Sequence, residues 1–174
     1  LAYRAPFAWD VLAALLRHDA MPGVESLHGG RYARTVRLSG RTGVVLVENA
    51  GVNGSVGRAA KTHLDVDASP SLLPALMPLL ARLRQLFDLD AEPAVVDACL
   101  VQGGLGRLVR SHPGVRVPGA FDGFEVALRI LVRGSERARG ESGELLRRVV
   151  ATLGEPFDSG IPGLDRVAPD ASAV

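Results

Sequence analysis

The spacing of apolar residues predicts helices along most of the chain. Residues 7–19 place their apolar side chains on one helical stripe, and residues 71–89 are rich in leucine. Because a proline inside a helix costs about 3 kcal/mol, the second helix should start near Pro74 or Pro78 and end near Phe87. Further helices are expected over 93–101, 104–111, 122–132 and 144–154.

Alternation of apolar and polar residues predicts strands between the first two helical stretches. Residues 31–38 alternate in this way, which predicts a strand with one face exposed. Its apolar side would carry Tyr32, Val36 and Leu38, and its solvent side Arg31, Thr35 and Arg37. Two more strands are expected over 44–49 and 61–68, with a glycine-rich loop over 50–57. These segments would form a small antiparallel meander.

The combined pattern predicts an α+β fold over residues 1–112, a small antiparallel sheet covered by helices. A break at Pro118 opens a second unit, residues 113–174. Asp122 is a good helix N-cap, and Glu125 completes a capping-box-like pair with it. Because two short helices cannot bury a core alone, this unit should either pack on the first or be incomplete.

Two stretches of the second unit carry no helical pattern. Residues 133–144 are polar and rich in glycine and arginine, and residues 157–174 are loop-like. We expect both to be irregular.

Composition supports a folded chain and excludes some kinds of site. Apolar residues make up 47% of the chain, and the net charge is only +1. Cys99 is the sole cysteine, which excludes an internal disulfide and a cysteine-based zinc site. No apolar run reaches the roughly 20 residues that span a bilayer. We expect a cytoplasmic protein with no membrane contact.

The sequence indicates no cofactor or metal. His63, Asp65 and Asp67 share one face of the expected strand over 61–68. A metal site would need further ligands converging from elsewhere, so a solvated strand face is the favoured interpretation. Phe7 and Trp9 could stack on bases, but their helical spacing with neighbouring aliphatic residues favours a place in the core.

Several strings in the sequence resemble the N-terminal half of bacterial DNA-3-methyladenine glycosylase II. They occur in the family's order and spacing and extend over nearly the whole chain. The strings are MPGVE (21–25), GGRYARTVRL (29–38), SPSLLPAL (69–76), LARLRQLFDLDAEP (80–93), PGVRVPGAFDGFE (113–125) and LGEPF (153–157).

The resemblance implies a fold and a domain context. It implies a sheet like one repeat of TATA-binding protein, followed by the first helices of an incomplete all-α glycosylase domain, truncated or degenerate. In that family the module occurs with a glycosylase half, or fused behind an adaptive-response transcription regulator.

The chain departs from the family where the chemistry would lie. The family's DNA-wedging segment corresponds to residues 130–136, and Arg133 and Gly134 occupy the wedge region. Glycine has no side chain with which to unstack a base pair. The family's helix-hairpin-helix motif and catalytic aspartate follow the segment that resembles 153–157, and no residue here corresponds to that aspartate. We nominate no catalytic residue and expect the chain alone to excise no base.

The second unit carries a local excess of arginine that could contact DNA phosphates. The candidate residues are Arg133, Arg137, Arg139, Arg147 and Arg148. The alternative is a solvated helix surface with ion pairs three and four residues apart, such as Glu144 with Arg147 and Arg148.

Three functions follow from these features. The first is the non-catalytic N-terminal portion of a repair glycosylase, which braces the catalytic half and contacts double-stranded DNA weakly and without sequence preference. The second is a catalysis-deficient regulatory or ligand-sensing module of a transcription regulator. The third is a free-standing protein-interaction domain. In the first two, the main partners are catalytic or regulatory domains of the same polypeptide.

Overall fold

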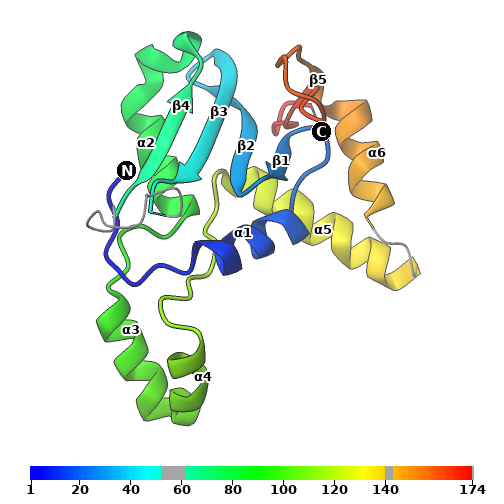
Figure 1. Ribbon diagram of the computed structural model, residues 1–174. Helices are drawn as coiled ribbons and strands as arrows, with labels where there is room; N and C mark the ends of the chain where they lie inside the picture. The colour runs from blue at the N-terminus through cyan, green and yellow to red at the C-terminus, as the bar shows by residue number, and fades with distance from the viewer. Residues whose placement is uncertain (52–61, 140–142, 174) are drawn as a thin grey trace.

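The computed structural model describes residues 1–51, 62–139 and 143–173, and for 136–139 it describes the backbone only. The predicted α+β fold is confirmed: a four-stranded antiparallel sheet in the order β1-β2-β3-β4 is covered by helices (Figure 1). The strands are β1 (Glu25–His28), β2 (Arg31–Leu38), β3 (Arg41–Asn49) and β4 (Leu64–Ala68). Most of the predicted loop over 50–57 lies outside the described residues.

The helices follow the predicted order. They are α1 (Trp9–His18), the 3-10 helix η1 (Pro70–Ala75), α2 (Leu76–Leu86), α3 (Pro93–Leu100), the short π-helical η2 (Val101–Leu105), α4 (Gly106–Ser111), α5 (Gly123–Arg139) and α6 (Glu144–Leu153). Pro74 lies in η1 and Pro78 in the first turn of α2, as their chemistry requires.

The helix α5 is longer than predicted. It continues to Arg139, so the expectation that residues 133–144 are irregular was wrong for the first seven of them. Arginine, alanine and glutamate in this stretch are good helix formers, and they outweigh the single Gly134.

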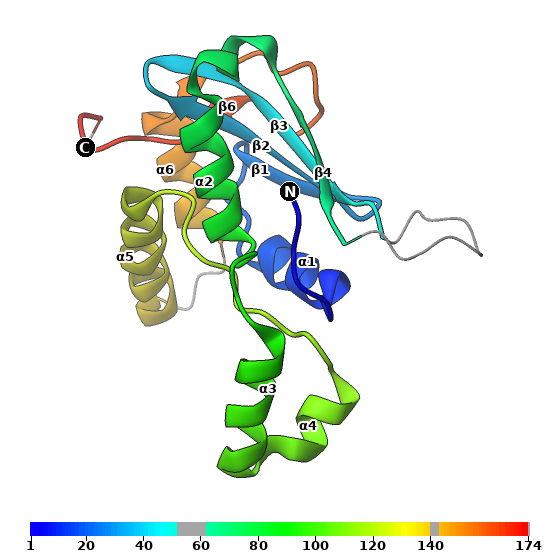
Figure 2. The ribbon, with the colours of Figure 1, turned by 90° about the vertical axis from the view of Figure 1, so that its left-hand side faces the viewer.

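The main core lies between one face of the sheet and the helices α1 and α2 (Figure 2). Trp9 is buried there, as predicted, and its indole Nε1 donates to the carbonyl of Gly30 over 3.0 Å. The rings of Tyr32 and Phe87 meet edge to face with centroids 5.5 Å apart.

The sheet is covered on its second face as well, so the prediction of a half-exposed β2 was wrong. Leu164 packs against Ala33 and Val44, and the Thr35 hydroxyl donates to the carbonyl of Arg166 over 2.7 Å. The covering segment contains β5 (Glu155–Pro156) and β6 (Arg166–Val167), which pair with each other. The tail predicted as a loop therefore forms a layer of the fold.

The segment that joins α4 to α5 is fixed by two glycines. A Cβ at Gly114 would overlap the backbone of Pro6, and one at Gly119 would overlap the carbonyl of Gln85. Both glycines also hydrogen-bond to these segments: Gly114 accepts from Ala8 and Gly119 donates to Leu86, each over 3.0 Å. The predicted domain division at residue 112 stays a prediction.

The helices α3 and α4 form a hairpin that projects away from the sheet (Figures 1 and 2). Within α3, η2 and α4, Pro93 is the one buried residue. In the described part of the chain, no helix combines the length and the hydropathy needed to cross a membrane.

Candidate nucleic-acid interface and the anchor of α5

The helices that carry the predicted phosphate-contacting arginines pack against each other. Met21, Val24, Val132, Leu146 and Val150 form a small apolar cluster between α5, α6 and the segment before β1. With Leu146 and Val150 facing inward, the opposite side of α6 faces solvent.

Arg133 is turned toward the end of α1. Its guanidinium donates to the Asp19 carboxylate over 2.6 Å and to the His18 carbonyl over 3.3 Å. Partial burial alone would raise the pKa of Asp19, but the hydrogen bonds from Arg133 and His18 outweigh it and lower that pKa. Arg133 thus has an internal acceptor at the position where the resemblance places the wedge.

Arg147 and Arg148 are exposed on the solvent side of α6. Arg147 lies 3.7 Å from the Glu144 carboxylate, which matches the predicted pair three residues apart. Arg148 forms no ion pair with the described residues. Arg137 and Arg139 lie in the last turns of α5, but their side chains are outside the described part of the structure.

The start of α5 is capped by Asp122, as predicted. Its carboxylate accepts from the backbone N–H of Phe124 over 2.9 Å and of Glu125 over 3.4 Å. The predicted capping-box partner is wrong. Glu125 points its carboxylate into the protein, toward Arg34 of β2.

A cluster of three buried charged side chains and the half-buried Arg129 anchors α5 to the sheet. Arg34 donates to Glu125 over 2.6 Å and lies 3.6 Å from Glu25 of β1. Arg129, one turn beyond Glu125, donates to Glu25 and lies 3.7 Å from Glu125. Two cations thus meet two carboxylates, and we call this group the α5 anchor: Glu25, Arg34, Glu125 and Arg129.

Neutral groups complete the surroundings of the α5 anchor. The Tyr32 hydroxyl donates to Glu25 over 2.7 Å, and the backbone N–H of Met21 donates to the same carboxylate over 2.8 Å. The guanidinium of Arg34 also lies over the ring of Phe121, 3.7 Å from its centroid. Two buried carboxylates are therefore paired with two arginines and with these donors, although Arg34 Nη1, Glu125 Oε2 and Arg129 Nε have no hydrogen-bond partner among the described residues.

Burial and charge act against each other at Arg34. Its side chain is 1% exposed, and burial alone would lower its pKa. The attraction of Glu125, together with that of Tyr32 and Glu25 and the hydrogen bond to Glu125, outweighs burial and raises the pKa of Arg34 above its ordinary value. Burial, followed by the nearby charge of Glu25, raises the pKa of Tyr32 well above its usual range. The anchor therefore keeps Arg34 charged and Tyr32 neutral.

Sequence reasoning missed the α5 anchor, although a signal for it existed. The alternation that turns Tyr32 and Val36 inward also turns Arg34 inward, and a buried arginine requires carboxylate partners. One partner, Glu25, is near in sequence, but Glu125 is separated from Arg34 by 91 positions.

On the strand face that was expected to be solvated, an ion-pair contact joins His63, just before β4, to Asp65. His63 Nε2 lies 3.3 Å from Asp65 Oδ1. Across the described ranges, no group of three potential metal ligands converges.

Comparison with known proteins places the chain in a sequence family. Residues 1–122 match the family described as "AlkA N-terminal domain". The chain is 30% identical to "DNA-3-methyladenine glycosylase 2" of Escherichia coli (strain K12) over 158 residues, which is 91% of this chain and 51% of that protein. The chain thus spans about half the length of this relative. The resemblance drawn from the sequence strings is confirmed.

A second relative combines two functions in its name. "Probable bifunctional transcriptional activator/DNA repair enzyme AlkA" of Mycobacterium tuberculosis is 33% identical over 157 residues, which cover 90% of this chain and 29% of that protein. Among solved structures, "3-methyladenine dna-glycosylase from Archaeoglobus fulgidus" has the same fold, with a TM-score of 0.71 and 15% identity. The match covers 99% of this chain and 56% of that one.

Proposed function

Because the chain belongs to the AlkA N-terminal domain family, we propose that it is the non-catalytic N-terminal portion of a DNA-3-methyladenine glycosylase-like repair protein. In this role it braces a base-excising half and contacts the DNA backbone. We place the catalytic carboxylate outside residues 1–174 and the protein in the cytoplasm.

The α5 anchor is the observation that carries the bracing role. It ties the helix that opens the second unit to two strands of the sheet through buried ion pairs. On its outer side, α5 exposes Ile130 and Leu131, which are 67% and 70% accessible. A helix fixed on one side and apolar on the other supports a role in orienting further helices.

Backbone contact with DNA is supported by the solvent side of α6. Arg147 and Arg148 are exposed there, and guanidinium groups pair well with phosphate oxygens. The net charge of the whole chain is only +1, so such binding should be weak, sensitive to salt and independent of base sequence.

The first experiment measures base release. We expect the purified chain to release no methylated purine from alkylated duplex DNA above a heat-killed control. Release above that control would refute the non-catalytic role.

A DNA-binding titration over a range of salt concentrations tests the proposed contact between α6 and the DNA backbone. We expect Arg147→Ala with Arg148→Ala to weaken binding and to reduce the slope of log K against log salt by about 2, because two phosphate contacts are lost. Arg110→Ala is the matched control, since Arg110 is exposed on the distant α3–α4 hairpin (Figure 1). Equal effects of the two changes would exclude α6 as the interface.

A regulatory module is the second candidate. It is favoured by Gly134, which has no wedge side chain although a Cβ there would meet no atom within 4 Å. The printed name of the Mycobacterium tuberculosis relative also includes transcriptional activation. Sequencing the natural gene distinguishes the two candidates. A helix-hairpin-helix motif and an aspartate encoded downstream favour the glycosylase. A helix-turn-helix domain encoded upstream, without that downstream motif and aspartate, favours the regulator.

A further inference from the structure

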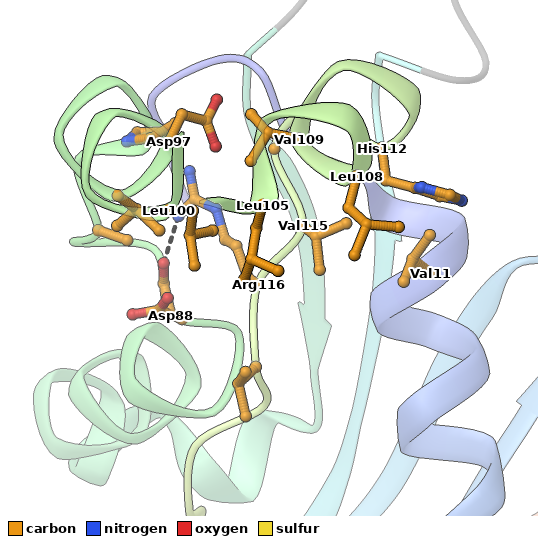
Figure 3. Close-up of a pocket in the computed structure, with 15 residues that line it drawn as sticks. Val11, Asp88, Asp97, Leu100, Leu105, Leu108, Val109, His112, Val115 and Arg116 are labelled. Atoms are coloured by element: carbon orange, nitrogen blue, oxygen red, sulfur yellow. Dashed lines mark hydrogen bonds between the residues drawn. The ribbon is translucent and has the colours of Figure 1, made fainter. Parts of the chain in front are cut away.

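The start of α5 borders a small cavity of about 80 Å³ between β2, α2 and residues 167–170. The charged side chains that line it are Arg37, Arg82, Asp122, Glu125 and Asp170. The larger groove of about 580 Å³ beside the α3–α4 hairpin is lined mainly by aliphatic side chains, and its buried Arg116 donates to the carbonyl of Asp88 (Figure 3). Water that enters the small cavity would therefore meet charged groups, including one member of the α5 anchor.

Residues 155–170, which we call the strap, form one wall of the small cavity. The strap follows α6, contains β5 and β6, and lies against the second face of the sheet (Figure 1). Its Leu164 is buried there. The backbone N–H of Arg166 donates to the carbonyl of Gly23 over 3.0 Å, and the carbonyl of Arg166 accepts from the Thr35 hydroxyl over 2.7 Å. The middle of the strap is thus attached by a buried side chain and by hydrogen bonds.

A single arginine holds both ends of the strap. Arg37 of β2 donates one terminal nitrogen to the Asp170 carboxylate over 3.0 Å and the other to the Glu155 carboxylate. Glu155 is the first residue of the strap and Asp170 is its last. The Arg37 side chain is 31% exposed, so dissolved ions can compete for it and weaken both ion pairs.

The strap also shields the α5 anchor from water. Glu125 lines the small cavity, although its side chain is only 7% exposed. Its Oε2 atom has no hydrogen-bond partner among the described residues. Removing the wall formed by residues 167–170 would let water solvate Glu125. The attraction between Glu125 and Arg34 would then weaken, because it is strongest where the effective dielectric constant is low.

We propose that the strap is a lid over the start of α5, held closed by the two ion pairs of Arg37. When the lid opens, residues 155–170 leave β2, Glu125 becomes hydrated and α5 is held less firmly, while the core between the sheet and the helices α1 and α2 stays folded. The strap follows α6 directly, so the lid couples the end of α6 to the start of α5. This coupling goes beyond the proposed function and does not depend on base release.

Backbone hydrogen exchange of the 174-residue chain, followed by NMR, tests the lid. We expect Arg37→Met to speed up exchange of the Asp165 and Arg166 amides by about 3–30-fold, because two partly exposed ion pairs are lost on closing. Arg31→Met is the matched control on the same strand. It should leave these two amides unchanged, because the pair of Arg31 with Glu48 is the same whether the lid is open or closed.

A side-chain proton reports on the anchor in the same experiment. The Nε–H of Arg34 donates to the carbonyl of Thr35 over 3.2 Å and is buried. If the lid shields the anchor, exchange of this proton should speed up in Arg37→Met by about the same factor as exchange of the strap amides. Arg37→Lys keeps the charge but loses the forked geometry, so it should give an intermediate acceleration.

Salt tests the role of charge without any substitution. Raising sodium chloride from about 0.05 to 0.5 M should speed up exchange of the strap amides in the unmodified chain and leave it unchanged in Arg37→Met. The proposal is overturned if salt has no effect, if Arg37→Met behaves as Arg31→Met does, or if the strap amides exchange as slowly as those of β3. Faster strap amides with an unchanged Arg34 Nε–H would also overturn it, because the strap would then open without exposing the anchor.

Discussion

Beneath α5, three charged side chains are buried and a fourth, Arg129, is half-buried, whereas on the α3–α4 hairpin aliphatic side chains face solvent. The usual distribution of side chains is reversed in both regions. They differ in where the partners lie. Each charge of the α5 anchor meets an opposite charge within the described chain, while the described residues leave the aliphatic side chains of the hairpin uncovered.

The difference follows from the energies involved. An unpaired buried charge costs several kcal/mol, so a fold cannot leave the α5 anchor incomplete. Leaving aliphatic surface exposed to water costs only about 25 cal/mol of free energy per Å², so the fold can tolerate a hairpin with exposed aliphatic side chains. The charges of the anchor must therefore be paired within one stable unit, whereas the aliphatic side chains of the hairpin can stay exposed.

Arg34→Met should have the largest effect. It leaves Glu25 and Glu125 with one arginine instead of two, and we expect a loss of about 3–5 kcal/mol in the free energy of unfolding, measured by urea denaturation. Arg31→Met is the matched control on the same strand, because the exposed pair of Arg31 with Glu48 should contribute no more than about 1 kcal/mol.

A double variant keeps this prediction testable if the single variant unfolds. Arg34→Met combined with Glu125→Leu removes one ion pair as a unit, so the double variant should be more stable than Arg34→Met alone. If Arg34→Met cost no more than Arg31→Met, the anchor would not hold α5.

The two regions should also respond differently to the loss of aliphatic side chains. Leu83→Ala in the core should cost about 2–5 kcal/mol, whereas Leu108→Ala in the 174-residue chain should stay within about 0.5 kcal/mol. Thermal or urea unfolding measures both. A large cost for Leu108→Ala in this chain would mean that the hairpin is already covered.

The smallest expected effect concerns the pair of Asp19 with Arg133. Because folding lowers the pKa of Asp19 below 3.8, the pair should stabilise the protein above that pH, and this stabilisation should be lost as the pH falls through the folded-state pKa. The contribution should stay below about 1 kcal/mol, as for other partly exposed pairs.

This pH dependence can be measured by urea denaturation at several pH values from roughly 2 to 6, a range that includes the reference pKa of aspartate. Asp19→Asn should remove it, and Arg133→Met should reduce it. If the free energy of unfolding of both variants still fell at low pH as in the unmodified chain, the pair would be excluded as the cause of that fall.

Local patterns predicted much of the fold. Helical spacing located α1 and α6, and the N-cap Asp122 located the start of α5. The strand β1 was missed because it has only four residues, and its pairing with β2 is set by tertiary contacts. The layer over the second face of β2 was missed because β5 and β6 have two residues each.

The site was harder to predict than the elements. The exposed position of Arg147 and Arg148 agrees with the helical period of α6. By contrast, Glu125 lies 91 positions from its partner Arg34, and Asp19 lies 114 positions from its partner Arg133. No local pattern reports a contact over such a distance, so an inward-facing Arg34 could indicate only that some carboxylate was needed.

The separation of 91 positions between Arg34 and Glu125 also sets an order for folding during synthesis. At bacterial rates of about 5–20 residues per second, Glu125 leaves the ribosome roughly 5–20 s after Arg34. During that interval Glu25 is the one carboxylate of the α5 anchor available to Arg34. The full set of ion pairs around Arg34 can therefore form only after the start of α5 has been made.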